Sequence, residues 1–331
     1  MARCVRVSKR DGEYIRALLI DTGFLDPDHK IKADGDSLLL PVLRDVDGFE
    51  TLEADLEVQA HAITDYREFV NIPDVLKGEL PNSYDVIGDV AIIKFDPNHP
   101  NKHEIGEALL RVTPSLRTVM LDAGVKGEFR IRDLVQIAGT GGSETIHKEF
   151  GVRMIVDPAK VYFNPRLATE RSRVAGEVKD GEVIIDMFAG VAPFGLVISK
   201  HAKPEIIYSI DLNPDAAGFM QRNIEANHVT NIVPITGNAA TAVNDLPEAD
   251  RIIMNLPHMA DLFLPHALKK LKTGGIIHLH KIVERSETEW FAKKFIADSE
   301  LSGYKIHIAR SAELKTYSPT MSVYVFDIVK D

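Results

Sequence analysis

A short run in the second half of the chain places an acid directly before a turn of small residues. The apolar segment 183–187 contains Asp186, and Ala189-Gly190-Val191-Ala192-Pro193-Phe194 follows before an apolar helical pattern begins. This order is typical of a buried parallel strand that ends at a tight turn, where backbone approaches a ligand closely. In open α/β sheets the ligand crevice lies at such strand ends. An ordinary strand–turn–helix unit is the alternative.

The composition of this turn argues against a pyrophosphate ligand. A dinucleotide site has G-x-G-x-x-G here, so that backbone amides and a helix N-terminus meet the pyrophosphate. This turn lacks the first and last glycines and contains Pro193. The pattern instead resembles motif I of S-adenosylmethionine (AdoMet) methyltransferases, whose ligand carries a sulfonium and no phosphate. The resemblance implies donor contacts from Asp186, Phe188, Ala189, Gly190 and Val191.

The next two predicted strands end in further polar groups. Asp211 ends the segment 206–211, where a carboxylate can accept both ribose hydroxyls of a nucleoside. A helix N-cap or a loop acid is the alternative. AdoMet methyltransferases usually have Asp where Asn238 stands, to accept from the adenine amino group, and Asn can accept through its carbonyl. The resemblance therefore implies that Asp211, Leu212, Asn238 and Ala239 complete the nucleoside site.

The tetrapeptide Asn255-Leu256-Pro257-His258 follows the fourth predicted strand. Methyltransferases that act on planar nitrogens of bases have an Asn/Asp-Pro-Pro-aromatic variant at this position. There the side-chain carbonyl holds the edge of the target base, and the rigid proline backbone positions it beside the methyl group. The resemblance thus implies that Asn255 serves both the donor and the acceptor site.

These residues need a parallel sheet to bring them together. From residue 164 onward, strands alternate with helices and short loops, which predicts a parallel sheet covered on both faces. The loop 310–322 lacks a helical pattern, as expected before an antiparallel last strand. The predicted fold class is α/β, with a Rossmann-like seven-stranded AdoMet methyltransferase domain. Its strands are expected at 183–187, 206–211, 232–236, 251–255, 275–282, 304–309 and 323–329.

Two smaller units are expected upstream of this sheet. Residues 1–65 are predicted to form a small N-terminal α/β module for substrate recognition, with a purely structural extension as the alternative. Residues 66–160 are predicted to form an α+β middle domain that includes a hairpin of 144–149 and 153–157, and residues 161–331 to form the methyltransferase domain. The irregular stretch between Asp65 and Leu80 is interpreted as a linker.

The net charge of −10 does not by itself indicate a nucleic-acid partner. Phosphate binding needs a local basic surface rather than a basic average. Residues 126–173 contain nine Lys or Arg against six Asp or Glu, which fits either RNA contact or a solvated face. Cys4 is the single cysteine, and neither a signal peptide nor an apolar stretch of roughly 18 residues is present. We therefore expect a cytoplasmic protein without disulfides or a membrane span.

Three further segments have a distinctive order of residues. They are Val161-Tyr162-Phe163-Asn164-Pro165-Arg166-Leu167-Ala168-Thr169-Glu170-Arg171, Gly127-Glu128-Phe129-Arg130 and Thr145-Ile146-His147-Lys148-Glu149. Together with the motifs above, they resemble the archaeal and eukaryotic tRNA (guanine-37-N1)-methyltransferases. The resemblance covers essentially the whole chain from about residue 85, and more loosely the part before it. It implies methyl transfer from AdoMet to N1 of guanosine 37 in the tRNA anticodon loop, and recognition of the distant tRNA elbow by the N-terminal module.

The chemistry of this reaction requires a base and a cation. Guanine N1 carries a proton and is a poor nucleophile, so its methylation needs a base. Negative charge builds on O6 as the proton leaves, so a positioned cation stabilises it. The resemblance implies that Glu170 is the base, Arg130 the cation and Asn255 the holder of the guanine edge. A surface pairing of Glu170 with Arg166 or Arg173 is the alternative.

Guanosine 37 must leave the anticodon stack to reach the donor, and unstacking costs a few kcal/mol. Contacts along the tRNA can offset this cost, and we expect them in the basic stretch 126–173. Arg166 either contacts a phosphate or holds Glu170. The resemblance implies contacts with the base or the tRNA from Tyr162, Arg166, Pro257, Lys148 and Arg132.

Several alternatives stay open at this stage. Ala192 and Asn238 depart from the expected residues, which leaves an inactive RNA-binding module as a rival. Related enzymes transfer an aminocarboxypropyl or methyl group to a wyosine precursor at the same tRNA position, but Glu170 and the intact Asn255-Leu256-Pro257 favour simple guanosine methylation. The expected partner is tRNA with guanosine 37, without an obligate protein partner. No tightly bound metal is expected, and Mg²⁺ can act through the tRNA.

Overall fold

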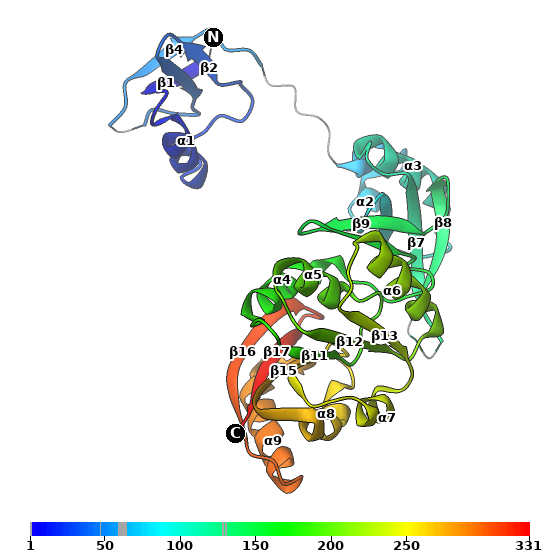
Figure 1. Ribbon diagram of the computed structural model, residues 1–331. Coiled ribbons are helices and arrows are strands. Elements are labelled where there is room, and N and C mark those ends of the chain that lie inside the picture. The colour runs from blue at the N-terminus through cyan, green and yellow to red at the C-terminus, as the bar shows by residue number, and fades with distance from the viewer. Residues whose placement is uncertain (1, 47, 59–64, 128, 130) are drawn as a thin grey trace. The chain divides into compact units, whose positions relative to one another are not determined.

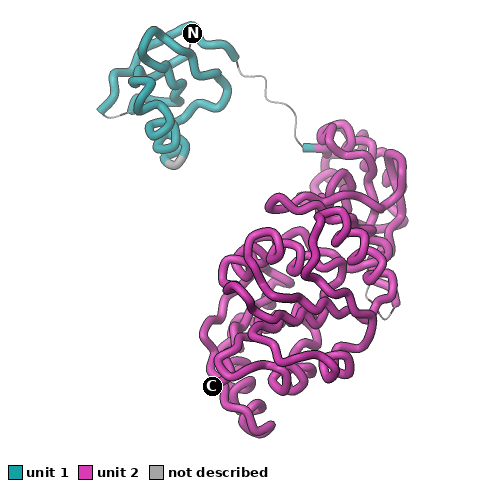
Figure 2. The backbone as a smooth tube through the Cα atoms, in the orientation of Figure 1, with its two compact units in different colours: residues 1–65 teal, residues 66–331 magenta. Residues whose placement is uncertain are grey.

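The computed structural model describes residues 2–46, 48–58, 65–127, 129 and 131–331. The chain divides into two compact units, residues 1–65 and residues 66–331 (Figure 2). Each unit has hydrophobic cores built from its own residues. Among the helices of the described ranges, none is long and apolar enough to cross a membrane.

The N-terminal unit is an antiparallel sheet with a helix against it. Its strands, in the order β2-β3-β1-β4, are β2 (Lys32–Asp34), β3 (Ser37–Pro41), β1 (Ala2–Ser8) and β4 (Thr51–Ala54). Val5 and Val7 of β1 meet Ile15 and Leu19 of α1 (Gly12–Asp21) in the core. Gly35 turns the chain between β2 and β3 at a φ of 58°, which glycine adopts without steric cost. The predicted small N-terminal α/β module is confirmed.

The second unit begins with a four-stranded sheet, in the order β5 (Asp85–Ile87), β6 (Val90–Ile93), β7 (Thr118–Lys126) and β8 (Ile131–Gly139). Helix α3 (Lys102–Val112) packs against β7 and β8. The 3₁₀ helix η1 (Tyr66–Phe69) and the short α2 (Asp74–Lys77) precede this sheet. The predicted linker between Asp65 and Leu80 is wrong, because Tyr66, Val70 and Leu80 are buried in the core with α3. Short turns space the apolar residues of 65–80 irregularly, so this stretch shows neither a helical nor a strand periodicity of hydrophobic residues.

A two-stranded hairpin connects this sheet to the rest of the unit. Strands β9 (Thr145–Glu149) and β10 (Val152–Val156) turn through Phe150 and Gly151, whose φ angles are 44° and 77°. Two successive positive φ angles match the twist of a tight hairpin. The side-chain amide of Asn223 pairs with the backbone of Ile155, accepting at 2.6 Å and donating at 3.1 Å. The predicted hairpin is confirmed, and Asn223 of helix α6 (Pro214–Ala226) anchors it.

The largest sheet is a doubly covered seven-stranded one (Figure 1). Five strands are parallel neighbours, and β17 pairs antiparallel with both β15 and β16. The expected α/β methyltransferase fold is confirmed. In sheet order the strands are β13 (Ile232–Thr236), β12 (Ile206–Asp211), β11 (Val183–Asp186), β14 (Ala249–Met254), β15 (Leu271–Glu284), β17 (Met321–Lys330) and β16 (Ile306–Thr316).

Helices cover both faces of this sheet, as the sequence predicted. One face packs on α4 (Ala168–Glu177), α5 (Pro193–His201) and α6 (Pro214–Ala226). The other packs on α7 (Ala239–Ala242), α8 (Leu264–Lys270) and α9 (Thr288–Leu301). The first core also includes Ile87 and Met120 of the upstream sheet. Whether 66–160 and 161–331 are separate domains stays a prediction.

The predicted loop 310–322 is wrong in extent. Strand β16 continues to Thr316 and β17 begins at Met321, so most of that stretch pairs within the sheet. The cause is the position of β16 at the sheet edge, where charged residues such as Arg310, Glu313 and Lys315 replace an apolar pattern. Edge strands commonly carry charge that discourages pairing with another chain.

Candidate functional site

The predicted donor residues lie at one edge of the seven-stranded sheet. Strand register pairs Asp186 of β11 with Ser209 of β12, and Asp211 of β12 with Thr236 of β13. Asn255 follows the last residue of β14 directly. Because these strands are parallel, their carboxyl ends meet at the same edge. Cavities of about 380 and 540 Å³ lie elsewhere, between α8 and α9 and at the opposite edge of the sheet, so they do not mark this site.

The turn after β11 holds its backbone against Asp211. The N–H of Gly190 donates to Asp211 Oδ2 at 2.7 Å, and the N–H of Asn213 donates to Oδ1 at 2.9 Å. Gly190 and Ala192 both have positive φ, 56° and 62°. An L-residue in this left-handed conformation costs roughly 1–2 kcal/mol. The backbone therefore explains why glycine was expected at Ala192, and the chain tolerates the methyl group there.

The segment with the predicted acceptor residues covers this turn. A Cβ built on Gly190 would lie 3.2 Å from the carbonyl oxygen of Tyr162, so a side chain has little room there. The Tyr162 side chain itself is exposed, whereas Phe163 is buried. Asn164 fixes the next turn, because its Oδ1 accepts from the Arg166 N–H at 3.0 Å. The structure thus brings the Tyr162 segment and the turn after β11 together.

Burial governs the electrostatics of the two strand-end acids. Asp186 is fully buried, and burial raises its pKa to about 7 despite the hydrogen bond from the Phe188 N–H. Its Oδ2 has no hydrogen-bond partner within the described ranges. Burial also raises the pKa of Asp211, against the lowering effect of the N–H groups of Asn213 and Gly190. These buried carboxylates have oxygen lone pairs without a hydrogen-bond donor in the described part of the chain. They could bind the cationic and hydroxyl groups of a ligand, and AdoMet has both.

The remaining donor residues line the same edge. Asn238 Oδ1 accepts from the Ala240 N–H at 2.9 Å and thereby caps α7. A carbonyl oxygen has a second lone pair, so this cap leaves an acceptor for an adenine amino group. Phe188 packs edge-on against Phe263 at 5.0 Å between ring centroids. Leu212 is exposed, whereas Val191 and Ala239 are buried.

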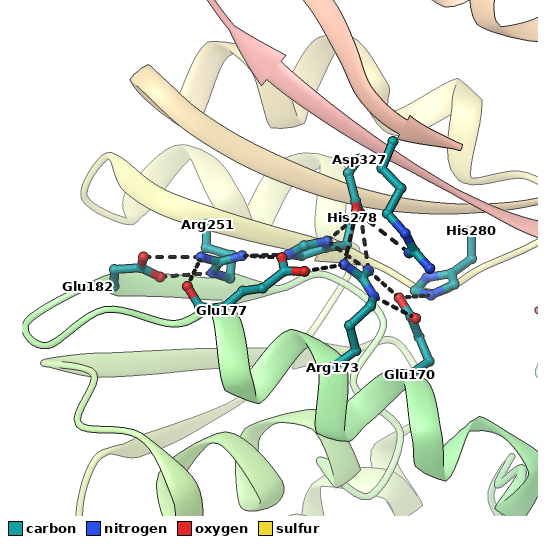
Figure 3. A network of polar contacts seen from close by, with 9 residues as sticks. Glu170, Arg173, Glu177, Glu182, Arg251, His278, His280 and Asp327 are labelled. Atoms are coloured by element: carbon teal, nitrogen blue, oxygen red, sulfur yellow. Dashed lines mark hydrogen bonds and ion pairs between the residues drawn. The ribbon is translucent and has the colours of Figure 1, made fainter. Parts of the chain in front are cut away.

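Glu170 lies in the first turn of α4, inside a buried network of charges (Figure 3). Arg173 binds it with two hydrogen bonds, Nη2 to Oε1 at 2.5 Å and Nε to Oε2 at 2.9 Å. The same guanidinium contacts Asp327 at 2.9 Å and Glu177 at 2.7 Å. Asp327 accepts from the buried His278 at 2.6 Å. The pairing with Arg173 left open from the sequence is therefore present, although it is buried and not on the surface.

This network fixes the charge of Glu170. Burial alone would raise the pKa of Glu170, but the hydrogen bonds and charge of Arg173, with a further contribution from His280, outweigh it and lower the pKa to about 2. The carboxylate is therefore charged at neutral pH and free of protons, as a base must be. The predicted role of Glu170 as a base requires that it gives up part of its contact with Arg173.

The expected alternative contact of Arg166 with Glu170 is wrong, because Arg166 pairs with Asp85. Its Nε and Nη2 lie 2.9 and 2.8 Å from Asp85 Oδ1. Arg132 donates to the other oxygen of Asp85 at 2.9 Å. Lys315 belongs to the same group, because burial and then the charge of Arg166 lower its pKa. Asp122 also lies 3.8 Å from Arg132, so two acids stand among three cations, which leaves net positive charge for a phosphate.

The other predicted tRNA and base residues are less constrained. Lys148 lies exposed on β9. Pro257 accepts a backbone hydrogen bond from Ile282 at 2.9 Å, which ties its loop to β15. Arg130 and Glu128 lie outside the described residues. The sequence missed Asp85 and the buried roles of Arg173 and His280, and only the i, i+3 spacing of Glu170 and Arg173 indicated any of these contacts.

Three family models match the chain. A TRM5/TYW2 methyltransferase domain matches residues 145–305, a tRNA methyltransferase 5 N-terminal domain matches residues 4–50, and a TYW2 N-terminal domain matches residues 67–142. The tRNA (guanine(37)-N(1))-methyltransferase Trm5b of Pyrococcus abyssi is 41% identical over 322 residues, 96% of each chain. A tRNA(Phe) (4-demethylwyosine(37)-C(7)) aminocarboxypropyltransferase of Methanocaldococcus jannaschii is 33% identical over 246 residues, 74% of this chain and 96% of that protein.

Solved structures match over the same extent. The crystal structure of Pyrococcus abyssi Trm5b superposes with a TM-score of 0.79 at 39% identity, covering 100% of both chains. Methanocaldococcus jannaschii Trm5 in complex with adenosine has a TM-score of 0.68 at 31% identity, covering 99% of both. A complex of aTrm5 with tRNALeu has a TM-score of 0.71 at 32% identity, again covering 99% of both. The two ligands in these structures are a nucleoside and a tRNA.

Proposed function

The chain belongs to the TRM5/TYW2 methyltransferase family, and we propose that it transfers the methyl group of AdoMet to N1 of guanosine 37 in tRNA. The observation that carries the proposal is the extent of the similarity. It covers 96% of the chain for the Pyrococcus abyssi methyltransferase but 74% for the aminocarboxypropyltransferase. A cytoplasmic location, expected from the sequence, belongs to the same proposal.

On the donor side, the strand-end acids bind and orient AdoMet, which supplies a methyl group made electrophilic by its sulfonium. Asp211 accepts the ribose hydroxyls through the lone pairs that its two backbone N–H bonds leave available. The Oδ2 atom of Asp186, which has no partner in the described residues, accepts a hydrogen bond from a cationic or hydroxyl group of AdoMet. Asn238 accepts the adenine amino group. The turn from Phe188 to Val191 lies against the nucleoside.

On the acceptor side, Asn255 holds the guanine edge, while Tyr162 and Pro257 wall the pocket. Glu170 takes the N1 proton, and Arg130 stabilises the charge that develops on O6. Arg132 and Arg166, held together by Asp85, contact a tRNA phosphate, and Lys148 contributes from β9. Glu170 is ionised at neutral pH, so it can accept a proton, and its basicity rises when the guanine takes over part of its contact with Arg173.

Nucleoside analysis tests the proposed reaction. An unmodified tRNA transcript with guanosine 37 is incubated with the protein and AdoMet, digested, and analysed by mass spectrometry. The expected product is guanosine with one methyl group on N1. A transcript with adenosine 37 is the control and stays unmodified. An aminocarboxypropyl group or a methyl group on another atom contradicts the proposal, as does the absence of any product.

An Asp211→Asn variant is expected to bind AdoMet about 10- to 100-fold more weakly. A hydrogen bond to a charged group contributes about 1.5–3 kcal/mol, and the amide keeps one acceptor but loses the charge and the second. Calorimetric titration with AdoMet measures the change. Asp215→Asn is the matched control, because Asp215 lies exposed in the first turn of the following helix. Unchanged affinity in the Asp211 variant removes Asp211 from the donor site.

A further inference from the structure

His280 is a fully buried imidazole beside Glu170 that has no part in the reaction described above. Its Nε2 lies 3.6 Å from Glu170 Oε1, slightly beyond hydrogen-bond length (Figure 3). Neither ring nitrogen has a hydrogen-bond partner within the residues that the structure describes. Buried polar groups are nearly always paired, and an exception in a native structure calls for a functional explanation.

Strand pairing places His280 next to the proposed guanine site. Met254 of β14 pairs with Leu279 of β15, so the next position along both strands brings Asn255 beside His280. The imidazole also packs against Phe194 of α5, with 5.9 Å between ring centroids. His280 therefore lies next to both the residue that holds the base and the residue that takes its proton.

We propose that His280 receives the guanine N1 proton from Glu170, so that the carboxylate and the imidazole form a two-step proton relay. This inference rests on the proposed methyl transfer. The bond between sulfur and the methyl carbon breaks with its electron pair on sulfur, and the electron pair that the proton leaves on N1 forms the new N–C bond. The proton binds Glu170 Oε1. Rotation about the C–O bond then turns it towards His280 Nε2, which becomes an imidazolium.

The ion pair with Arg173 explains why a second acceptor is useful. The ion pair with Arg173 lowers the pKa of Glu170 well below 4.5, so its protonated form is short-lived at neutral pH. Imidazole is the side chain best suited to accept and release protons near neutral pH. Transfer to His280 restores the carboxylate that Arg173 binds and leaves an imidazolium beside it. After product release, the proton returns to water by the same path.

Among the described residues, Glu170 is the acid nearest to the His280 ring, with its Oε1 3.6 Å from Nε2. The neighbours of this ring, Phe194 of α5 and Asn255, which directly follows β14, carry no charge. The next residue across on β17, Val325, is apolar. The charged or titratable groups nearby are Glu170 and Arg173 from α4, His278 from β15, Asp327 from β17 and Arg310 from β16, the last 3.7 Å from Asp327.

The pH dependence of single-turnover methyl transfer tests the relay. Measured between pH 5 and 8 with saturating AdoMet and excess enzyme over a guanosine-37 transcript, the wild-type rate is expected to rise with pH, because the relay needs a neutral imidazole to accept the proton. A His280→Gln variant is expected to be about 100-fold slower and flat across the same range. Its affinities for AdoMet and tRNA, measured separately, stay within a few-fold of the wild type. His307→Gln, at an exposed histidine on β16 paired with Asp331, is the control and keeps the wild-type profile.

The outcomes separate the relay from the methyl transfer itself. A wild type that forms no N1-methylguanosine overturns the proposed function. A wild type that methylates guanosine, with a His280→Gln variant that keeps its rate and pH profile, overturns only the relay. Should the Gln variant not fold, His280→Asn takes its place. A wild-type rate that is independent of pH between 5 and 8 contradicts the relay without any variant.

Discussion

A Glu170→Gln variant is expected to methylate guanosine 37 about 100 to 10,000 times more slowly than the wild type in single turnover. The amide has nearly the shape of the carboxylate, but it cannot accept the N1 proton. The measurement uses saturating AdoMet and excess enzyme over a tRNA transcript, so that product release does not limit the rate. The affinities for AdoMet and tRNA are expected to change little, because the loss is confined to the chemical step.

Glu177→Gln is the matched control for this variant. Glu177 binds the same guanidinium as Glu170, at 2.7 Å from Arg173 Nη1, but it lies at the far end of α4 and is largely exposed. Its replacement is expected to leave the rate within a few-fold of the wild type. A Glu170 variant with the full rate is incompatible with its role as base. An equal loss in both variants would assign the effect to the position of Arg173 instead.

Stability gives a second readout for Glu170. Its pKa is lowered from 4.5 to about 2 in the folded protein, so the charged carboxylate stabilises the fold above pH 4.5, and this contribution is lost as the pH falls towards 2. The shift corresponds to roughly 3 kcal/mol at most. The free energy of unfolding of Glu170→Gln at pH 7 is therefore expected to be lower than that of the wild type, with a difference that narrows towards pH 2.

The buried ion pair does not conflict with catalysis, because Arg173 has other partners. It contacts Asp327 at 2.9 Å and Glu177 at 2.7 Å, so it stays paired when Glu170 turns partly towards a guanine. Catalytic hydrogen bonds often reach their working geometry only in the complex with substrate. Glu170 stays charged until the guanine arrives, and it shares Arg173 with two other acids. It can therefore accept a proton briefly and pass it on.

The shared position of the predicted donor residues at one sheet edge could be predicted from sequence, because it depends on local order. Asp186 and Asp211 each end a strand, and parallel strands bring their ends to one edge whatever the loops between them. Ala192 stands where glycine was expected, and its φ of 62° shows that the backbone there has the left-handed conformation that favours glycine. Asn238 was assigned correctly to the end of β13, although its use as the cap of α7 becomes visible only in the structure.

The acceptor half depends on contacts between distant segments, which no spacing reveals. Arg166 meets Asp85 across 81 positions, and Arg173 meets Asp327 across 154. His280 was assigned to a strand, but its place beside Glu170 follows from the packing of α4 on β15. The mistaken linker between Asp65 and Leu80 has a related cause, because its apolar residues are buried by a helix that comes later in the chain.

Arg171 and Glu149 form a buried ion pair near this site, and breaking it is expected to destabilise the fold strongly. The guanidinium is 1% exposed and donates to both carboxylate oxygens, at 2.7 and 2.5 Å, and its Nη1 donates to the Asn164 carbonyl at 3.2 Å. It thereby joins α4, the β9–β10 hairpin and the segment that carries Tyr162. Arg171→Met leaves the carboxylate of Glu149 buried without its cation, which costs about 3–5 kcal/mol in such pairs.

Urea unfolding of Arg171→Met, Glu149→Leu and the double variant separates the charge penalty from packing. The double variant is expected to recover most of the stability that Arg171→Met loses, because a buried ion pair replaced by apolar side chains of similar volume is often neutral or stabilising. Arg222→Met is the control, since its pair with Glu144 is half exposed and contributes at most about 1 kcal/mol. Additive losses in the double variant would mean that packing rather than charge holds this junction. In that case the orientation of the Tyr162 segment would not depend on the ion pair.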